Sequence, residues 1–200
     1  QNAGQVTILG DGTVTGTIHP LVADYQIYAP EGSTVTVQFG PGWTYSLSTN
    51  SHMPPPGGGV VHILVAGMRA SSTYQLRAKL TLPDGTIFYD SNRSFTTGDV
   101  PTERLPQLAV TKLGVPANGL EQLTLIGSSY DRLRSLITDI DGNVVWYYDY
   151  PDTDAFAFPF KLVRNGNFLV NMSSETNMSV PSELREIDLT GSVVRSLSVS

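Results

Sequence analysis

Histidine changes its charge most easily near neutral pH, so the three histidines are the first candidates for catalysis or metal binding. They are His19, His52 and His62. His62 lies in an alternating apolar run, which favours a structural role, and His19 precedes Pro20, which favours a turn. His52 stands beside a loop rich in proline and glycine, where we expect it to be solvated. Their spacing is not that of metal ligands, and we assign no catalytic, cofactor-binding or metal-binding residue.

Two groups of acidic residues could hold a calcium ion. Residues 139–143 begin like a calcium loop, but apolar residues follow where such a loop continues with oxygen ligands. We therefore interpret this segment as a hairpin turn. Asp149, Asp152 and Asp154 form the second group, for which a solvated acidic loop is the simpler interpretation. No cofactor is expected.

Aromatic side chains gather between residues 146 and 160, and such rings can bind sugars or aryl groups. Alternation along a strand places Trp146 on the same face as Tyr148 and opposite Tyr147. We favour core packing between propeller blades as their role. The full set is Trp146, Tyr147, Tyr148, Tyr150, Phe156, Phe158 and Phe160.

Short sequence motifs add little to this list. Asn92, Asn171 and Asn177 each begin a tripeptide that matches the acceptor pattern for N-glycosylation. That pattern is frequent by chance in a chain rich in serine and threonine. A glycine-rich phosphate loop, a Gly-x-Ser-x-Gly elbow and a zinc motif do not occur in the sequence.

The composition excludes several classes of protein. The chain has 200 residues, of which 40% are hydrophobic and 15% charged, and its net charge is −6. Such a chain lacks the clustered lysines and arginines that bind nucleic acid or anionic membranes. Cysteine is absent, which excludes disulfides and thiol chemistry. We expect no nucleic-acid partner and, because no apolar run is long enough, no membrane span.

The first half of the chain shows the sequence pattern of β-strands. Short alternating runs rich in Val, Ile, Thr, Tyr and Phe are separated by Gly, Pro, Asn or Asp, which is typical of an all-β protein. Asp84-Gly85 separates two runs and predicts a hairpin. We predict that residues 1–98 form a β-sandwich of the fibronectin type III or immunoglobulin kind, followed by a linker at 99–106. The expected strands are 5–9, 13–18, 24–28, 33–39, 44–48, 60–65, 73–82, 86–89 and 93–97.

The second half contains an internal repeat. Residues 139–145 match residues 188–194, and an Asn165-Gly166 hairpin lies between the two copies. Two hairpins in succession, repeated after 40–50 residues, predict a four-stranded propeller blade. Residues 107–200 would then form a partial β-propeller of about two blades, whereas a propeller closes with about 4–8. We expect the missing blades to come from the same longer chain or from another subunit, with a homo-oligomer as one form of the latter.

Motifs of both halves occur in a particular order. Ser94-Phe95-Thr96-Thr97-Gly98 is similar to a fibronectin type III ending, and it is followed by Asp141-Gly142-Asn143-Val144-Val145-Trp146 and then by Asn165-Gly166-Asn167. This order resembles the bacterial arylsulfotransferase (aryl-sulfate sulfotransferase) family. The resemblance implies a β-sandwich followed by a six-bladed propeller. It also implies sulfuryl transfer from an aryl sulfate to a phenol through a transiently sulfated histidine.

No catalytic residue of that family is carried over to this chain. Residues 157–160 read Ala-Phe-Pro-Phe at the place where the family's repeats often have a histidine. The start at Gln1 favours a processed product, and the strand-like end favours a fragment. We therefore expect the N-terminal portion of a secreted, periplasmic or cell-surface arylsulfotransferase-like protein whose catalytic histidine lies elsewhere. Two alternatives stay open, namely a non-catalytic extracellular binding protein and a structural subunit of a surface assembly.

Overall fold

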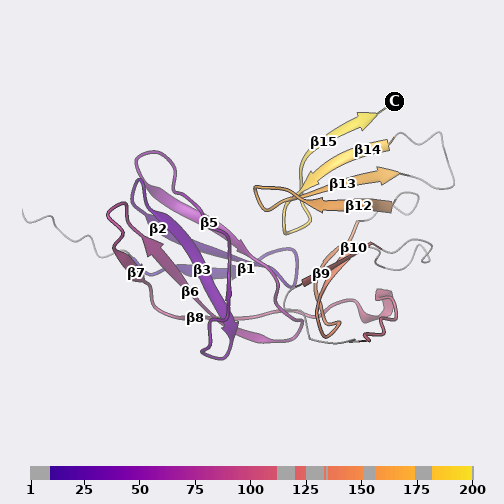
Figure 1. Cartoon of the computed structure of the whole chain (residues 1–200), viewed down its shortest axis with the longest axis horizontal. Helices are drawn as coiled ribbons and strands as arrows, with labels where there is room; N and C mark the ends of the chain where they lie inside the picture. Colours follow the sequence, from indigo (N-terminus) through magenta and orange to yellow (C-terminus); the bar gives the residue numbers. More distant parts are fainter. Residues whose placement is uncertain are drawn as a thin grey trace, which may run out of the picture. The chain divides into compact units, whose positions relative to one another are not determined.

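The computed structural model describes residues 10–111, 120–124, 133, 135–150, 156–173 and 182–199. Within them the regular structure consists of antiparallel strands and one 3₁₀ helix, η1 (Thr102–Arg104) (Figure 1). The prediction of an all-β chain is confirmed, and none of the sheets closes on itself. The part of the chain that the structure describes has no helix long and apolar enough to cross a membrane.

The chain divides into two compact units. Unit 1 comprises Gln1–Gly16, Ala23–Val65 and Ser72–Thr96. Unit 2 comprises Thr17–Val22, Ala66–Ser71 and Thr97–Ser200. The expected limits of 1–98, 99–106 and 107–200 stay predictions.

Unit 1 contains two antiparallel sheets. The first has the strand order β1 (Thr13–Gly16), β2 (Ala23–Ala29), β5 (Gly59–Val65). The second has the order β4 (Leu47–Ser48), β3 (Thr34–Pro41), β6 (Thr73–Thr81), β7 (Ile87–Tyr89), and β8 (Arg93–Thr96) also pairs with β6. Strand β4 is shorter than the expected 44–48, because Gly42 and Tyr45 adopt positive φ angles of 63° and 44° that interrupt extended backbone. The expected strand 5–9 lies outside the described residues.

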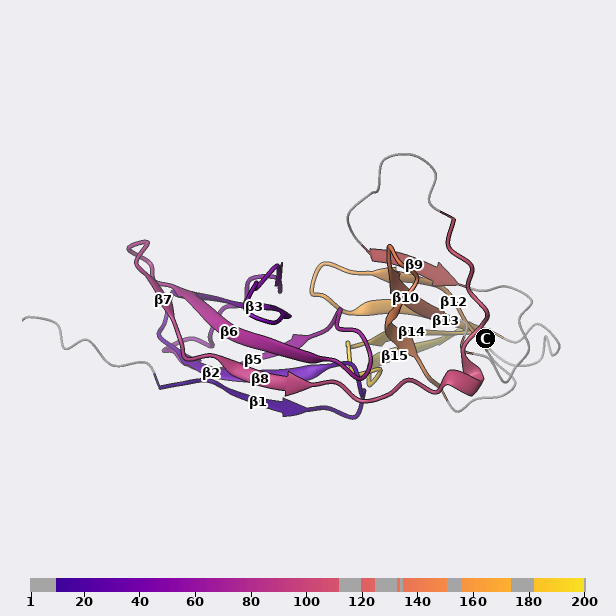
Figure 2. The ribbon, with the colours of Figure 1, turned by 90° about the horizontal axis from the view of Figure 1, so that it is seen from below.

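Alternation along these strands builds the core of unit 1. In β6 every second side chain is buried, and β2, β3 and β5 repeat the same pattern. Figure 2 shows β3 and β6 in one layer and β1, β2 and β5 in the other. The buried rows are Ala23, Tyr25, Ile27, Ala29, Val35, Val37, Phe39, Val61, Ile63, Val65, Tyr74, Leu76, Ala78 and Leu80. The opposite rows of both sheets therefore face solvent.

The Asp84-Gly85 hairpin is confirmed. Strands β6 and β7 pair in antiparallel register, with Leu80 opposite Phe88. The Gly85 N–H donates to the Leu82 carbonyl at 2.9 Å, and Gly85 has a φ of 86°. Glycine adopts that angle without the steric cost that a Cβ would bring.

Unit 2 contains two further antiparallel sheets. One has the order β11 (Val144–Tyr148), β10 (Ser135–Asp139), β9 (Leu120–Thr124). The other runs in chain order through β12 (Phe156–Leu162), β13 (Phe168–Ser173), β14 (Ser182–Ile187) and β15 (Val193–Val199). In both sheets each strand pairs with the strand that precedes or follows it in the chain, which is the meander arrangement.

The internal repeat corresponds to a repeated turn. Gly142, Gly166 and Gly191 each donate their N–H to a carbonyl three residues earlier, at 3.0 Å in every case. Their φ angles are 82°, 87° and 85°. The three turns join β10 to β11, β12 to β13 and β14 to β15, so the hairpins predicted from the sequence are present.

The grouping of these hairpins differs from the expected unit. The sequence pattern joined the hairpin β10–β11 to the hairpin β12–β13, but these two hairpins belong to different sheets. The four-stranded sheet instead combines the turn at Gly166 with the turn at Gly191. A turn fixes the pairing of its own two strands only, whereas the edge-to-edge pairing of β13 with β14 depends on contacts farther apart in the chain.

Two apolar contacts hold unit 2 together around β11. On one side Leu21, Leu133, Leu136 and Tyr147 form a buried cluster, against which Ala70, Val100, Leu105 and Val144 pack. On the other side the ring of Trp146 lies 4.6 Å from that of Phe168. The Trp146 indole N–H donates to the Leu189 carbonyl at 2.7 Å, which ties β11 to the β14–β15 turn.

Candidate functional site

His62 and His52 have the roles of surface and strand-edge residues. The His62 Nδ1 lies 3.0 Å from the Asp24 carboxylate, and the His62 side chain is 61% exposed. The backbone of His52 forms an isolated bridge with Val35, and burial lowers the pKa of its imidazole. The His62–Asp24 pair is solvent-exposed, and among the described residues no side-chain hydrogen bond or ion pair links His52 to a titratable group.

His19 is the buried histidine, with 5% of its surface exposed. Its Nδ1 accepts the Leu21 N–H at 3.1 Å, and its Nε2 lies 3.0 Å from the Tyr147 carbonyl oxygen. A carbonyl only accepts, so Nε2 carries the proton and the ring is neutral. Both nitrogens are thus engaged with backbone groups, which supports the expected turn role rather than a catalytic one.

The first acidic group folds as the expected turn. Asp139 Oδ1 accepts the backbone N–H groups of Asp141 at 2.9 Å and Asn143 at 3.0 Å. Arg69 donates to both carboxylates, at 2.6 Å to Asp139 and 3.1 Å to Asp141. Burial alone would raise the pKa of Asp139, but the bonds from Asn143, Asp141 and Arg69 hold it below its ordinary value. The carboxylate is used to cap the turn.

The second acidic group is only partly described. Asp149 forms an ion pair with Arg104 at 2.7 Å, and both residues are partly exposed. Asp152 and Asp154 lie outside the described residues. Among the residues that the structure does describe, no three histidine or acidic side chains are close enough together to hold a metal ion.

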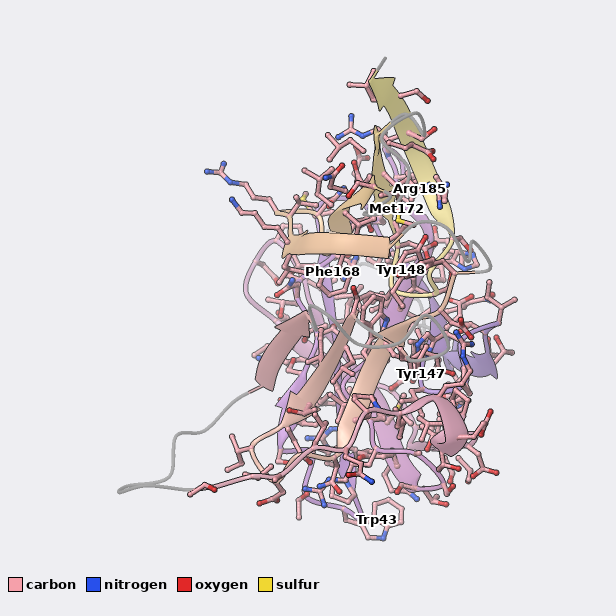
Figure 3. The ribbon with its side chains drawn as sticks, turned by 90° about the vertical axis from the view of Figure 1, so that its right-hand side faces the viewer. Trp43, Tyr147, Tyr148, Phe168, Met172 and Arg185 are labelled. Carbon is pink, nitrogen blue, oxygen red and sulfur yellow. The ribbon has the colours of Figure 1, made fainter. Side chains whose placement is uncertain are left out.

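The aromatic stretch packs where it is described. Trp146, Tyr147 and Tyr148 are 1%, 6% and 3% exposed, so none of them offers a free ring face. Tyr148 lies beside Arg185 (Figure 3), and Glu183 together with the Tyr148 hydroxyl raises the pKa of Arg185. The side chains of Phe156, Phe158 and Phe160 lie outside the described part, as does Asn177. Trp146, Tyr147 and Tyr148 are therefore core residues, whereas packing between blades stays a prediction.

The structure instead brings together a set of residues that the sequence did not single out, which we call the Arg77 site. The Arg77 guanidinium carbon lies 4.2 Å from the Tyr45 ring centroid and 4.4 Å from that of Tyr89. Such cation–π contacts hold a guanidinium in place while leaving its edge free to donate. The Arg77 site consists of Gln38, Tyr45, Gln75, Arg77, Tyr89 and Asn92.

Hydrogen bonds order the polar members of the Arg77 site. The Arg77 Nε donates to the Gln38 side-chain carbonyl at 3.1 Å. The Tyr45 hydroxyl donates to the Asn92 side-chain carbonyl at 2.6 Å, and the Asn92 amide in turn donates to Gln75. These side chains come from β3, β6 and the connections that flank β4 and β8. The arrangement is a partly exposed polar and aromatic surface on one face of a sheet.

The solvent-facing side of this sheet carries positive charge. In β6 the outward row is Thr73, Gln75, Arg77, Lys79 and Thr81. Thr34, Thr36 and Gln38 pair with that row from β3, and Tyr89 pairs from β7. None of these outward residues is an aspartate or glutamate. Asp90, which follows β7, is turned to the other side, where its carboxylate accepts the Tyr25 hydroxyl.

Part of this surface could have been found from the sequence. Strict alternation over residues 73–81 already places Gln75, Arg77 and Lys79 on one face of a strand. The approach of Tyr45 was not predictable from alternation, because it follows from the positive φ angles at Gly42 and Tyr45.

Comparison of the chain with protein-family models, with curated proteins and with solved structures finds no match.

Proposed function

We propose that this chain supplies a β-sandwich and propeller blades to a secreted, periplasmic or cell-surface protein of the arylsulfotransferase kind. In this proposal unit 1 is the fibronectin type III-like sandwich and unit 2 holds the first blades. The reaction would be sulfuryl transfer from an aryl sulfate to a phenol, at a histidine outside these 200 residues. The single observation that carries the proposal is the strand order of the second half, in which β12 to β15 form one four-stranded meander directly after the meander β9 to β11.

The packing in unit 2 supports this assignment. Blades of a propeller pack face to face through apolar side chains. Trp146 of β11 lies between the two meanders, against Phe168 of β13 and the turn at Leu189. Turns of the same geometry at Gly142, Gly166 and Gly191 suit a repeated unit.

The described residues act as scaffold in this proposal. His19 bonds two backbone groups, His62 pairs with Asp24 on a solvent-facing side, and His52 lies in a strand bridge. A transiently sulfated histidine needs an accessible nitrogen and cationic or hydrogen-bonding groups that stabilise the sulfate charge. None of the three has that environment in the part of the chain that the structure describes.

The test is the intact mass of the native protein, followed by an activity assay. A mass of about 60 kDa, the size of a sandwich with six blades, together with sulfate transfer from 4-nitrophenyl sulfate to phenol, would support the proposal. Phenol-dependent release of 4-nitrophenol is the readout. A native mass near 21.6 kDa would overturn it, because two open blades cannot enclose a reaction site.

A second candidate is a non-catalytic extracellular binding or surface-assembly subunit. The observation that favours it is the Arg77 site, a cationic and aromatic surface on a chain whose net charge is −6. This candidate predicts a native mass near 21.6 kDa for a monomer, or a multiple of it for an assembly. It also predicts no turnover of aryl sulfates.

A further inference from the structure

We propose that the Arg77 site binds an anionic polysaccharide, through a carboxylate or sulfate group held by the Arg77 guanidinium. This inference goes beyond the function proposed above and does not depend on it.

The guanidinium of Arg77 is held in place but still has donors to offer. Of its five N–H groups, the Nε–H is used by Gln38. Among the described residues, no acceptor lies within hydrogen-bond distance of its two terminal nitrogens. Contacts with the rings of Tyr45 and Tyr89 restrict the side chain before any ligand arrives, which lowers the entropic cost of binding. A fixed guanidinium fork matches the paired oxygens of a carboxylate or sulfate.

The charge of the surrounding face complements an anion. Lys79 stands two residues from Arg77 in β6, on the same outward row and about 7 Å along the strand. The cross-strand neighbours of this row are neutral, since Gln38 lies opposite Arg77 and Thr36 lies opposite Lys79. No aspartate or glutamate stands in this outward row or directly opposite Arg77 or Lys79. Two cations in line also suit a polymer that repeats its charge.

The remaining groups favour a sugar over a peptide or a nucleic acid. Side-chain amides of Gln75 and Asn92 are ordered beside Arg77, and amides both donate to and accept from hydroxyl groups. The Tyr89 ring is 51% exposed and can pack against the C–H face of a sugar. A nucleic acid would need more cations than the two on this face.

Three dextrans test the proposal on one polymer backbone. Titration calorimetry with the purified native protein would compare carboxymethyl dextran, dextran sulfate and uncharged dextran. We expect carboxymethyl dextran, dextran sulfate or both to bind, with an affinity that decreases as salt is added. The charged dextran that binds more tightly identifies whether the site prefers a carboxylate or a sulfate. Equal binding of uncharged dextran, or no binding of any form, would overturn the proposal. Stronger binding of poly-glutamate than of both charged dextrans would also overturn it, in favour of an acidic peptide.

Substitutions locate the site. Arg77→Gln should weaken binding of the charged dextran by about tenfold or more, and Arg77→Lys, which keeps the charge but loses the fork, should fall between it and the unaltered protein. Arg164→Gln removes the same charge from an exposed turn of unit 2 and should bind normally. If Arg77→Gln does not fold, as judged by its melting temperature, Lys79→Gln provides the second test. Unchanged binding by folded Arg77→Gln and Lys79→Gln would overturn the assignment to this face.

Discussion

His19 and Trp146 stack with parallel rings: their planes differ by 1° and their centroids are 5.9 Å apart. The same imidazole bonds the Leu21 N–H through Nδ1 and the Tyr147 carbonyl through Nε2. One neutral ring therefore joins the segment Thr17–Val22 to β11. Adding a proton would place an N–H at Nδ1 against the N–H of Leu21, so the protonated ring does not fit these contacts.

This geometry predicts a pH dependence of stability. Burial lowers the pKa of His19, although the Tyr147 carbonyl and nearby Asp149, which is itself paired with Arg104, act in the opposite direction. An unfolded histidine titrates near 6.5. Between that pH and the lower folded-state pKa, the unfolded chain binds more protons than the folded one, so the free energy of unfolding decreases as the pH falls.

Melting temperatures between pH 7.5 and 5 measure the effect. The unaltered protein should lose stability over this range more steeply than His19→Gln, which cannot be protonated. His52, whose pKa burial also lowers, is present in both proteins and cancels in the comparison. Parallel curves for the two proteins would contradict the role assigned to His19.

The sequence predicted the local elements and missed the grouping of some of them. Strands such as β5 and β6 follow from alternation, and the turns at Gly85 and Gly166 follow from Asp-Gly and Asn-Gly pairs, because both signals act between near neighbours. The division between β11 and β12 was not predicted, since no local signal determines which hairpins share a sheet. The propeller assignment rests on that division and stays a proposal.

The candidate site was predictable only in part, for a similar reason. Alternation places Arg77 on an outward row, but Tyr45 and Asn92 reach it from connections that flank β4 and β8. Such connections depend on single backbone angles, and Tyr45 itself has a φ of 44°. Conversely, the aromatic stretch around Trp146 attracted attention in the sequence, but Trp146, Tyr147 and Tyr148 are buried and Tyr150 is half-buried.

Glu186 is predicted to stabilise the four-stranded sheet through its charge. It is 4% exposed, and its carboxylate accepts the amides of Asn165 and Asn167, each at 2.7 Å, and the Arg195 guanidinium at 2.6 Å. The bonds from Asn165, Asn167 and Arg195 lower its pKa. Because the pKa of Glu186 is lower in the folded state than in the unfolded state, its charge stabilises the fold at pH values above the unfolded-state pKa. This contribution to the free energy of unfolding is lost as the pH falls through the folded-state pKa.

Glu186→Gln should therefore melt at a lower temperature than the unaltered protein at pH 7, and the difference should shrink as the pH approaches 3. Glu31→Gln changes an exposed glutamate between β2 and β3 and should leave the melting temperature nearly unchanged at pH 7. A constant difference between Glu186→Gln and the unaltered protein across the range would show that shape rather than charge matters at this position.

Trp146 is predicted to be a strong anchor for the β14–β15 turn. Trp146→Phe removes the donor to the Leu189 carbonyl and part of the ring that packs on Phe168. This bond is partly buried, and a buried polar group left without its partner costs about 1–3 kcal/mol. Urea denaturation should show a loss of stability in this range or above it. Trp43→Phe is the matched control, because Trp43 is 71% exposed, and it should change stability by less than about 0.5 kcal/mol.

Gly142 and Gly166 allow backbone strain to be separated from crowding. Both have a left-handed φ, 82° and 87°, so an alanine at either position should cost about 1–2 kcal/mol through its backbone alone. At Gly166 nothing lies within 4 Å of the added Cβ, whereas at Gly142 the Cγ2 of Val110 would be 2.5 Å away. Gly142→Ala should therefore destabilise the protein more than Gly166→Ala, as measured by urea denaturation. Adding Val110→Ala to Gly142→Ala should restore the additional stability that is lost through crowding. Adding Val110→Ala to Gly166→Ala should restore none, because position 166 has no contact with Val110. Equal losses at the two glycines would mean that Val110 moves aside freely, and the segment that carries it would then not be packed against the β10–β11 turn.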